Sequence, residues 1–165
     1  MKLRRGHFWL AIATATALVA TSCVSAEGRL NAKFDTLPQV DATLLYEHGD
    51  VSSGATGNCT VIFLDRWYGT TLDAKTVAKI YSDGFAENGW SIRPEEVVEI
   101  WSTEGDDGLY RVRLDVFADP TVISQQQVSY KLPDSVLYDA VRYQTVYLLS
   151  MVYMSPYAAD KCFGQ

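Results

Sequence analysis

The sequence predicts an α+β fold: a two-layer sandwich with one main helix on one face of a mostly antiparallel sheet of four or five strands. In residues 109–118, Tyr110, Val112 and Leu114 alternate with Arg111 and Arg113, which is typical of a half-buried antiparallel strand. In residues 72–88, apolar side chains recur about every 3.6 positions, which predicts an amphipathic helix. With 165 residues, 48% of them apolar, the chain is long enough for one domain with a core.

Residues 1–22 are predicted to be a signal peptide. Lys2, Arg4 and Arg5 precede an uncharged stretch of apolar and small residues over 8–20. That stretch is shorter than the 18 or so residues of a transmembrane helix and is typical of a secretory leader. We therefore expect the chain to be exported.

Two cleavage sites compete. Residues 19–23 resemble a bacterial lipobox, in which Cys23 becomes the lipid-modified N-terminus. The alternative is cleavage before Glu27, which discards Cys23 and leaves a secreted protein. We favour the lipobox, with residues 23–36 as a tether or linker and residues 37–165 as a single globular domain. The predicted location is then the bacterial cell membrane, on its extracytoplasmic face, through a lipid anchor.

The charge of the chain excludes two classes of partner. Residues 1–22 contain three basic and no acidic residues, so their removal changes the net charge from −6 to −9. An acidic domain of this kind is not expected to bind nucleic acid, because phosphate contacts need clustered Lys and Arg. Anionic lipid headgroups would repel it, so membrane attachment is expected through the lipid alone.

The cysteines of the mature chain predict one disulfide, between Cys59 and Cys162. It would close a loop of about 100 residues, and the chain-entropy model then gives a stabilisation of the folded state of roughly 4–5 kcal/mol. The alternative is two free thiols in a reducing compartment. The mature chain has a single histidine, His48, and no closely spaced cysteine pair, so no metal site and no cofactor are predicted.

The first half of the domain is predicted to contain strands over 41–47 and 59–68, with a flexible loop over 49–57 between them. The helix over 72–88 is expected to begin with Asp73 as its N-cap and to end at Asn88-Gly89. Gly84 lies inside this helix, where it is expected to allow a close approach to the sheet.

The second half is predicted to contain a hairpin, with strands over 97–101 and 109–118, and then a polar loop over 121–134. A short helix over 135–143 and a central strand over 145–154 follow, because residues 145–154 are apolar on both faces. A single helix through 135–153 is the alternative. Ser155-Pro156 predicts a last helical turn leading to Cys162.

No catalytic motif occurs in the sequence. A Ser-His-Asp site would have to use His48, which is followed by Asp50, and we interpret both as residues of a solvated loop. Glu95, Glu96 and Glu99 could be the paired carboxylates of a glycosidase, but we interpret them as solvated charge. Glu104, Asp106 and Asp107 could belong to a calcium loop, but we interpret them as a plain hairpin turn. No enzyme activity is predicted.

The strand over 145–154 offers a candidate partner surface. Tyr147 and Tyr153 share one face of it with Leu149 and Met151, and tyrosine and methionine are enriched at interface cores. The alternative is that this face is core beneath the helix. In that case the other face of the strand becomes the candidate surface.

The segment Thr71-Leu72-Asp73, with Val77, Ile80-Tyr81, Phe85 and Asn88-Gly89-Trp90, resembles one found in small bacterial lipoproteins of uncharacterised function. The resemblance covers about 20 residues. It implies a lipid-anchored extracytoplasmic α+β domain and carries over no catalytic residues.

These observations predict a non-enzymatic, lipid-anchored domain that binds an envelope protein partner or acts as an accessory subunit of a membrane assembly. The alternative is a small secreted hydrolase or ligand-binding enzyme of unknown substrate.

Overall fold

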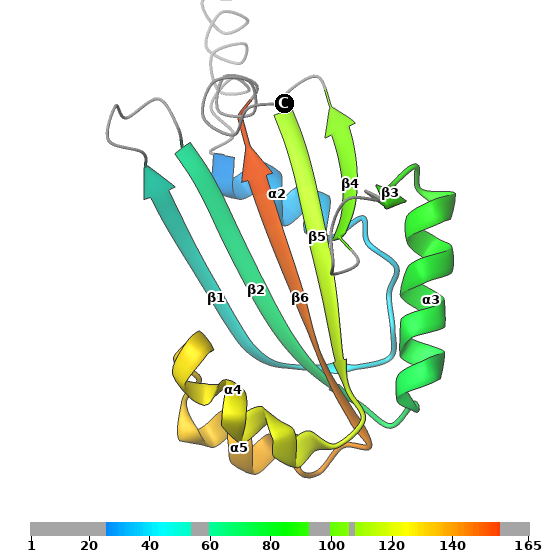
Figure 1. The fold of residues 1–165 in the computed structure, drawn as a ribbon, viewed down its shortest axis with the longest axis vertical. Coiled ribbons are helices and arrows are strands. Elements are labelled where there is room, and N and C mark those ends of the chain that lie inside the picture. Colours follow the sequence, from blue (N-terminus) through cyan, green and yellow to red (C-terminus); the bar gives the residue numbers. More distant parts are fainter. Residues whose placement is uncertain (1–25, 54–59, 93–99, 106–107, 156–165) are drawn as a thin grey trace, which may run out of the picture.

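A computed structural model describes residues 26–53, 60–92, 100–105 and 108–155, and it confirms the α+β class (Figure 1). The sheet runs the length of the molecule, and all its strand pairs are antiparallel. In chain order the elements are α2 (Ala26–Phe34), β1 (Thr43–Ser53), β2 (Thr60–Thr70), α3 (Ala74–Glu87), β3 (Ser91–Ile92), β4 (Ile100–Gly105), β5 (Gly108–Phe117), the 3-10 turn η1 (Pro120–Val122), α4 (Ile123–Tyr130), α5 (Asp134–Ala140) and β6 (Thr145–Met154).

The sheet has six strands in the order β1-β2-β6-β5-β4-β3, rather than the four or five predicted. The last strand, β6, lies in its centre between β2 and β5. A central strand has two buried faces, which explains why residues 145–154 are apolar on both sides. The predicted strand is confirmed, and the alternative of one helix through 135–153 is wrong.

Residues 23–36 were predicted to be a linker, and for the described part of this range that prediction is wrong. Helix α2 occupies Ala26–Phe34, and Leu30 and Phe34 are buried in the core. Arg66 of β2 holds this helix against the sheet: its guanidinium donates to Asn31 Oδ1 at 2.8 Å and lies over the Phe34 ring. The folded domain therefore includes α2.

Helix α3 agrees closely with the helix predicted over 72–88. Asp73 caps it by accepting from the backbone N–H groups of Lys75 and Thr76, both at 3.0 Å. Gly89, with φ of +76°, follows its C-terminal end. Gly84 allows a close approach, but to a different neighbour: a Cβ there would lie 2.2 Å from Pro38 Cγ, in the segment between α2 and β1.

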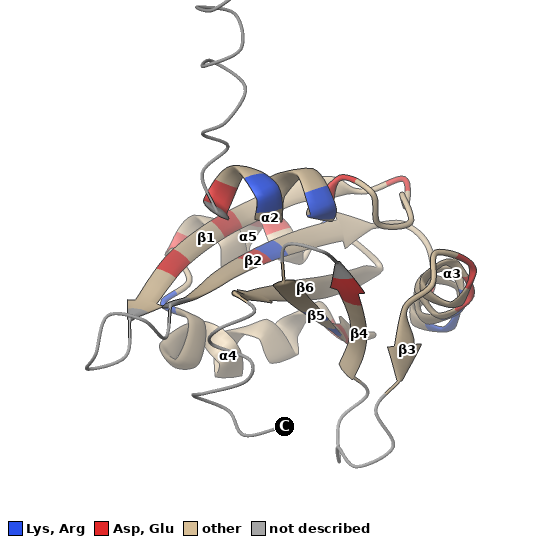
Figure 2. Cartoon of the chain, turned by 90° about the horizontal axis from the view of Figure 1, so that it is seen from above, with Lys and Arg blue, Asp and Glu red and all other residues tan. Residues whose placement is uncertain are grey.

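Helices α2 and α3 lie on one side of the sheet, which we call the covered face (Figure 2). Their apolar side chains pack on alternate residues of the central strands. Tyr147 and Tyr153 belong to this core, with 1% and 4% of their surface exposed. The prediction that they form a partner surface is therefore wrong, and the alternative that they are core is correct.

Helices α4 and α5 lie on the other side of the sheet, which we call the second face, and pack over one end of it (Figures 1 and 2). The polar loop predicted over 121–134 instead forms η1, α4 and the start of α5. A small core beneath them contains Trp67, Ile123, Leu132, Ala140, Val146 and Leu148. Helices thus lie on both faces of the sheet, not on one as the two-layer prediction had it.

Candidate functional site on the second face of the sheet

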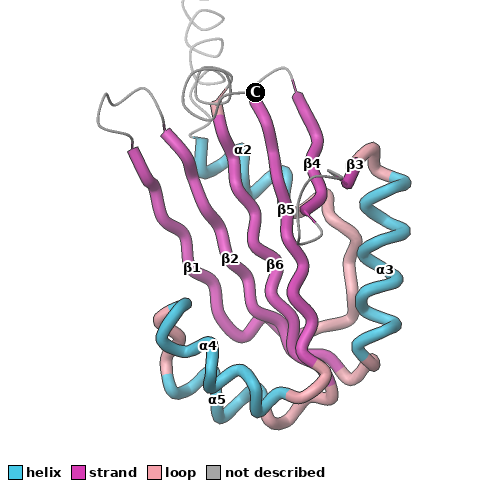
Figure 3. The backbone as a smooth tube through the Cα atoms, in the orientation of Figure 1, coloured by secondary structure: helices cyan, strands magenta, loops and turns pink. Residues whose placement is uncertain are grey.

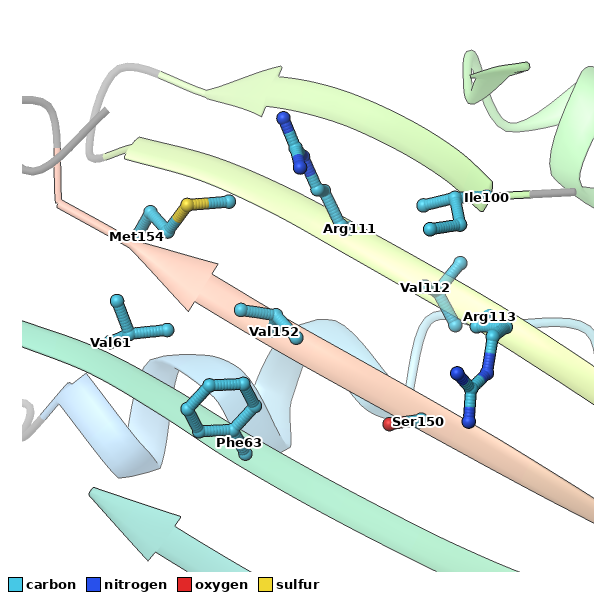
Figure 4. A pocket seen from close by; sticks show the side chains of 9 residues that line it. All are labelled: Val61, Phe63, Ile100, Arg111, Val112, Arg113, Ser150, Val152 and Met154. Atoms are coloured by element: carbon cyan, nitrogen blue, oxygen red, sulfur yellow. The ribbon is translucent and has the colours of Figure 1, made fainter. Parts of the chain in front are cut away.

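The second face carries a cavity of about 320 Å³. It lies on the part of the sheet that α4 and α5 leave uncovered. Figure 4 shows side chains from four neighbouring strands around it. The lining residues are Val61 and Phe63 of β2, Ile100 of β4, Arg111, Val112 and Arg113 of β5, and Ser150, Val152 and Met154 of β6.

Most of this cavity is apolar. Phe63, with 37% of its surface exposed, lies on β2 beside Val152 of β6, its partner in the sheet. Arg111 and Arg113 stand on β5 along one side of the cavity (Figure 4). The arrangement is an apolar floor with a cationic margin, which is the usual pattern of a binding surface rather than of a solvated sheet face.

A second cavity of about 250 Å³ adjoins the first, and Phe63 and Ser150 line both. It lies between the sheet and the last residues of α4. Its lining is more polar: His48, Asp50, Phe63, Asp65, Ser129, Tyr130, Lys131 and Ser150. We call the two cavities together the trough.

A row of polar side chains crosses the sheet where the trough meets α4. His48, Asp65, Ser150 and Arg113 come from β1, β2, β6 and β5, and each is the direct cross-strand partner of the next. Direct cross-strand partners share a face of the sheet. The strand register therefore aligns one imidazole, one carboxylate, one hydroxyl and one guanidinium.

Asp65 and Ser150 form the closest contact in this row. The hydroxyl of Ser150 donates to Asp65 Oδ1 at 2.5 Å. Burial raises the pKa of Asp65 above its usual range, although the Ser150 hydrogen bond and the charge of Arg113 oppose this shift. The carboxyl group is thus easier to protonate here than in water.

Arg113 connects the row to α4. Its Nε donates to Asp115 Oδ2 at 2.8 Å, and a second guanidinium nitrogen donates to the hydroxyl of Tyr130. Burial disfavours the charge of Arg113, but Asp115 and Tyr130 outweigh it, and the pKa of Arg113 is raised. Arg113 therefore remains a fixed cation beside the apolar floor. Tyr130 is held in turn by an edge-to-face contact with Trp67.

The row contains the three residue types of a serine hydrolase, but in a different order. In that mechanism the imidazole lies between the hydroxyl and the carboxylate and accepts the proton of the serine. Here the carboxylate of Asp65 lies between His48 and Ser150 in the sheet register and accepts from the serine itself. Among the described residues, no group of three His, Cys, Asp or Glu side chains could hold a metal ion.

Several predicted site residues lie outside the described part of the chain. These are Cys23, Cys59 and Cys162, the carboxylates Glu95, Glu96 and Glu99, and the turn residues Asp106 and Asp107. His48 and Asp50 are described, and they lie on the exposed part of β1 rather than in a loop.

The Asp65–Ser150–Arg113 row was missed by the sequence reasoning, although one signal was present. Ser150 interrupts the apolar side chains of β6 that share its face, Val146, Leu148 and Val152. A hydroxyl at such a position needs a hydrogen-bond partner.

The chain matches no known protein family, and no curated protein or solved structure is significantly similar to it. No helix in the described part of the chain is long and apolar enough to cross a membrane.

Proposed function

We propose that the protein is a non-enzymatic, lipid-anchored extracytoplasmic domain that binds an envelope protein partner through the trough. The observation that carries the proposal is the apolar cavity of about 320 Å³ with Arg111 and Arg113 on its margin. An apolar centre with arginine nearby is characteristic of the cores of protein interfaces. The partner we expect inserts an apolar side chain against Phe63 and places an acidic group near Arg113.

Site-specific photo-cross-linking in intact cells tests this proposal. The photoreactive residue p-benzoylphenylalanine replaces Phe63 in one variant and Tyr138 in a matched control. Tyr138 is an aromatic residue of α5 with 74% of its surface exposed, away from the trough. We expect one envelope protein to be linked from position 63 and not from position 138.

The partner so identified must also depend on the trough. Phe63→Asp should abolish its co-purification with the full-length chain, whereas Tyr138→Asp should leave it intact. Absence of a protein cross-link at position 63, or equal cross-links at both positions, would rule the proposal out.

The lipid anchor on Cys23 is part of the same proposal. Only Val24 and Ser25 separate this cysteine from α2, so an anchored domain would lie close to the membrane, with no tether. Mass spectrometry of the membrane fraction should find acyl chains on Cys23. A mature N-terminus at Glu27 would contradict the anchor and would leave a secreted domain.

The disulfide between Cys59 and Cys162 is supported by the course of the strands. Cys59 directly precedes β2, and the tail that carries Cys162 follows β6. Val61 and Met154 are paired, so the two segments leave neighbouring strands at the same end of the sheet. Thiol titration of the denatured, unreduced protein should detect neither cysteine, and two reactive thiols would contradict the bond.

A hydrolase is the second candidate function, and the hydrogen bond from Ser150 to Asp65 is the observation that favours it. It predicts that Ser150→Ala abolishes the hydrolysis of a chromogenic ester by the purified full-length protein. No ester hydrolysis by the wild-type chain above that of Ser150→Ala would exclude it.

A further inference from the structure

Strand β1 forms one edge of the sheet, as the tube in Figure 3 shows. It is eleven residues long, whereas β3 at the opposite edge has two. Residues 47–52 of β1 are exposed, and Val51 has 55% of its surface in solvent. Long exposed edge strands are uncommon in proteins, because their unpaired backbone groups pair readily with another strand.

One hydrogen bond shows which backbone groups of β1 point outward. The N–H of Val51 donates to the side chain of the preceding residue, Asp50 Oδ1, at 2.7 Å. The carbonyl of Phe63, 3.6 Å from a Cβ placed at Gly49, faces β1 at the Asp50–Phe63 pair, so the next N–H, that of Val51, points away from β2. Because backbone groups alternate along a strand, the N–H and C=O of Gly49 and Glu47 point outward as well. These groups can pair with an antiparallel strand from another chain.

Charge decides how a second copy of β1 would align. In an antiparallel pair of identical strands, a two-fold axis at residue 47 or 50 would place Glu47 or Asp50 opposite itself, and like charges directly opposite are destabilising. An axis at Gly49 instead places His48 of each copy opposite Asp50 of the other. The strand is therefore self-complementary in that register.

Gly49 is the residue at this axis. A Cβ at position 49 would meet Phe63 O at 3.6 Å and Leu64 Cδ1 at 3.8 Å, which are ordinary contacts. The fold itself therefore does not require a glycine at this position. Glycine inside a strand often marks a place where another backbone approaches closely.

The charge of Glu47 is already partly balanced within the chain. Its Oε2 accepts from Arg66 Nε at 2.5 Å. In the proposed register Glu47 lies opposite Val51 of the second copy, so its carboxylate meets no second acid. A short length, one of the features that usually protect an edge strand, is also absent here.

We propose that two copies of this chain associate through β1, antiparallel and with the two-fold axis at Gly49, to give a continuous sheet of twelve strands, six from each copy. The N–H of Val51 then donates to the C=O of Glu47 in the other copy. The side chain of Asp50 is released to the opposite His48. This association uses the edge of the sheet and does not depend on the ligand of the trough.

Disulfide trapping of the full-length chain tests the register. In the proposed dimer the two Cα atoms at position 49 lie about 5.5 Å apart, within the range of a disulfide. Position 52 is equally exposed, but in this register the two residues at position 52, one from each copy, lie six residues apart along the strands, or about 20 Å. Mild oxidation of Gly49→Cys should give a dimer linked at position 49, identified by peptide mass spectrometry, and Ser52→Cys should not self-link.

A proline substitution tests the hydrogen bonds. Val51→Pro removes an N–H that β2 does not use, so the monomer should keep its circular dichroism while its dimer dissociates. Val51→Ala is the matched control. Sedimentation equilibrium in detergent should give two chains for the wild type and Val51→Ala, and one for Val51→Pro.

A monomeric wild type, or Gly49→Cys that links no better than Ser52→Cys, would overturn the proposal. So would a folded Val51→Pro that is still dimeric. If Val51→Pro does not fold, the comparison of the two cysteine variants decides.

Discussion

The two faces of the sheet are built by the same strands but are covered to different extents. On the covered face, Tyr147, Leu149 and Met151 of β6 are each at most 1% exposed. On the second face, Val146 and Leu148 are completely buried, but Ser150 and Val152 further along β6 are only partly buried. The difference arises because α2 and α3 pack over the covered face, whereas α4 and α5 pack over one end of the second face.

The polar groups of the second face lie where this helical cover ends. Asp65, Ser150 and Arg113 are partly buried, and each has a hydrogen bond to a side chain. A charged group in the middle of the covered face would lose its hydration and gain no such partner, which would cost a large amount of folding free energy. Partial cover therefore allows a row of polar groups beside an apolar cavity, and this combination supports our proposal that a partner binds to the second face.

The largest effect is expected from truncation on the covered face. Tyr147 packs against the rings of Tyr68 and Tyr81, at centroid distances of 5.2 Å and 5.5 Å. Tyr147→Ala should lower the free energy of unfolding by about 3–5 kcal/mol, measured by urea denaturation, because it leaves a cavity in the core. Tyr147→Phe, the control, removes only the hydroxyl contact with Tyr81 and should cost about 1 kcal/mol. Similar values for the two variants would contradict the core assignment.

A smaller effect is expected where α2 joins the covered face. Arg66 contacts Asn31, Asp35 and Glu47, and its side chain is 15% exposed. Arg66→Ala should cost about 1–2 kcal/mol, because both carboxylates are more exposed than the arginine and contribute little. Hydrogen exchange should become faster in the amides of α2 but not in those of α3. Equal acceleration in both helices would mean that Arg66 stabilises the whole domain and not the docking of α2.

A still smaller effect is expected on the second face. Phe63 is more than a third exposed, so Phe63→Ala should change the free energy of unfolding by less than about 1 kcal/mol in the urea assay. The contrast with Tyr147→Ala measures the difference between the two faces directly. A loss of about 3 kcal/mol or more, on the scale of core truncations, would show that Phe63 is structural and not available to a partner.

The smallest effect is expected from the pKa of Asp65. Because that pKa is raised from 3.8, the folded state binds a proton at a higher pH than the unfolded chain does. Stability should therefore fall as the pH rises from about 3.8 through the raised pKa, and remain lower above it. Asp65→Asn removes this loss, so its urea midpoint relative to the wild type should increase between about pH 4 and pH 7. A constant difference would mean that Asp65 titrates alike in both states.

The local sequence predicted helices and strands well where the spacing of their apolar residues was regular. The helix over 72–88 followed from the spacing of its apolar residues and from the Asp73 cap. Strand β5 followed from its alternation, and β6 from its apolar residues on both faces. The linker over 23–36 and the polar loop over 121–134 were wrong for one physical reason. Short helices such as α2 and α4 carry only one or two anchoring side chains, and those are recognisable only against the sheet that buries them.

The sequence by itself determined that the chain is acidic and indicated its α+β class, because charge and the spacing of apolar residues are local properties. It contains the polar side chains of the trough but does not show that they come together. Only the tertiary structure decided which face of the strand is covered by α2 and α3. It buries Tyr147 and Tyr153 on that face, so they do not form a partner surface. It also placed His48, Asp65, Ser150 and Arg113 in one row. That row depends on the register of four strands that are up to about 100 residues apart in the chain, and register is fixed by packing rather than by any single segment.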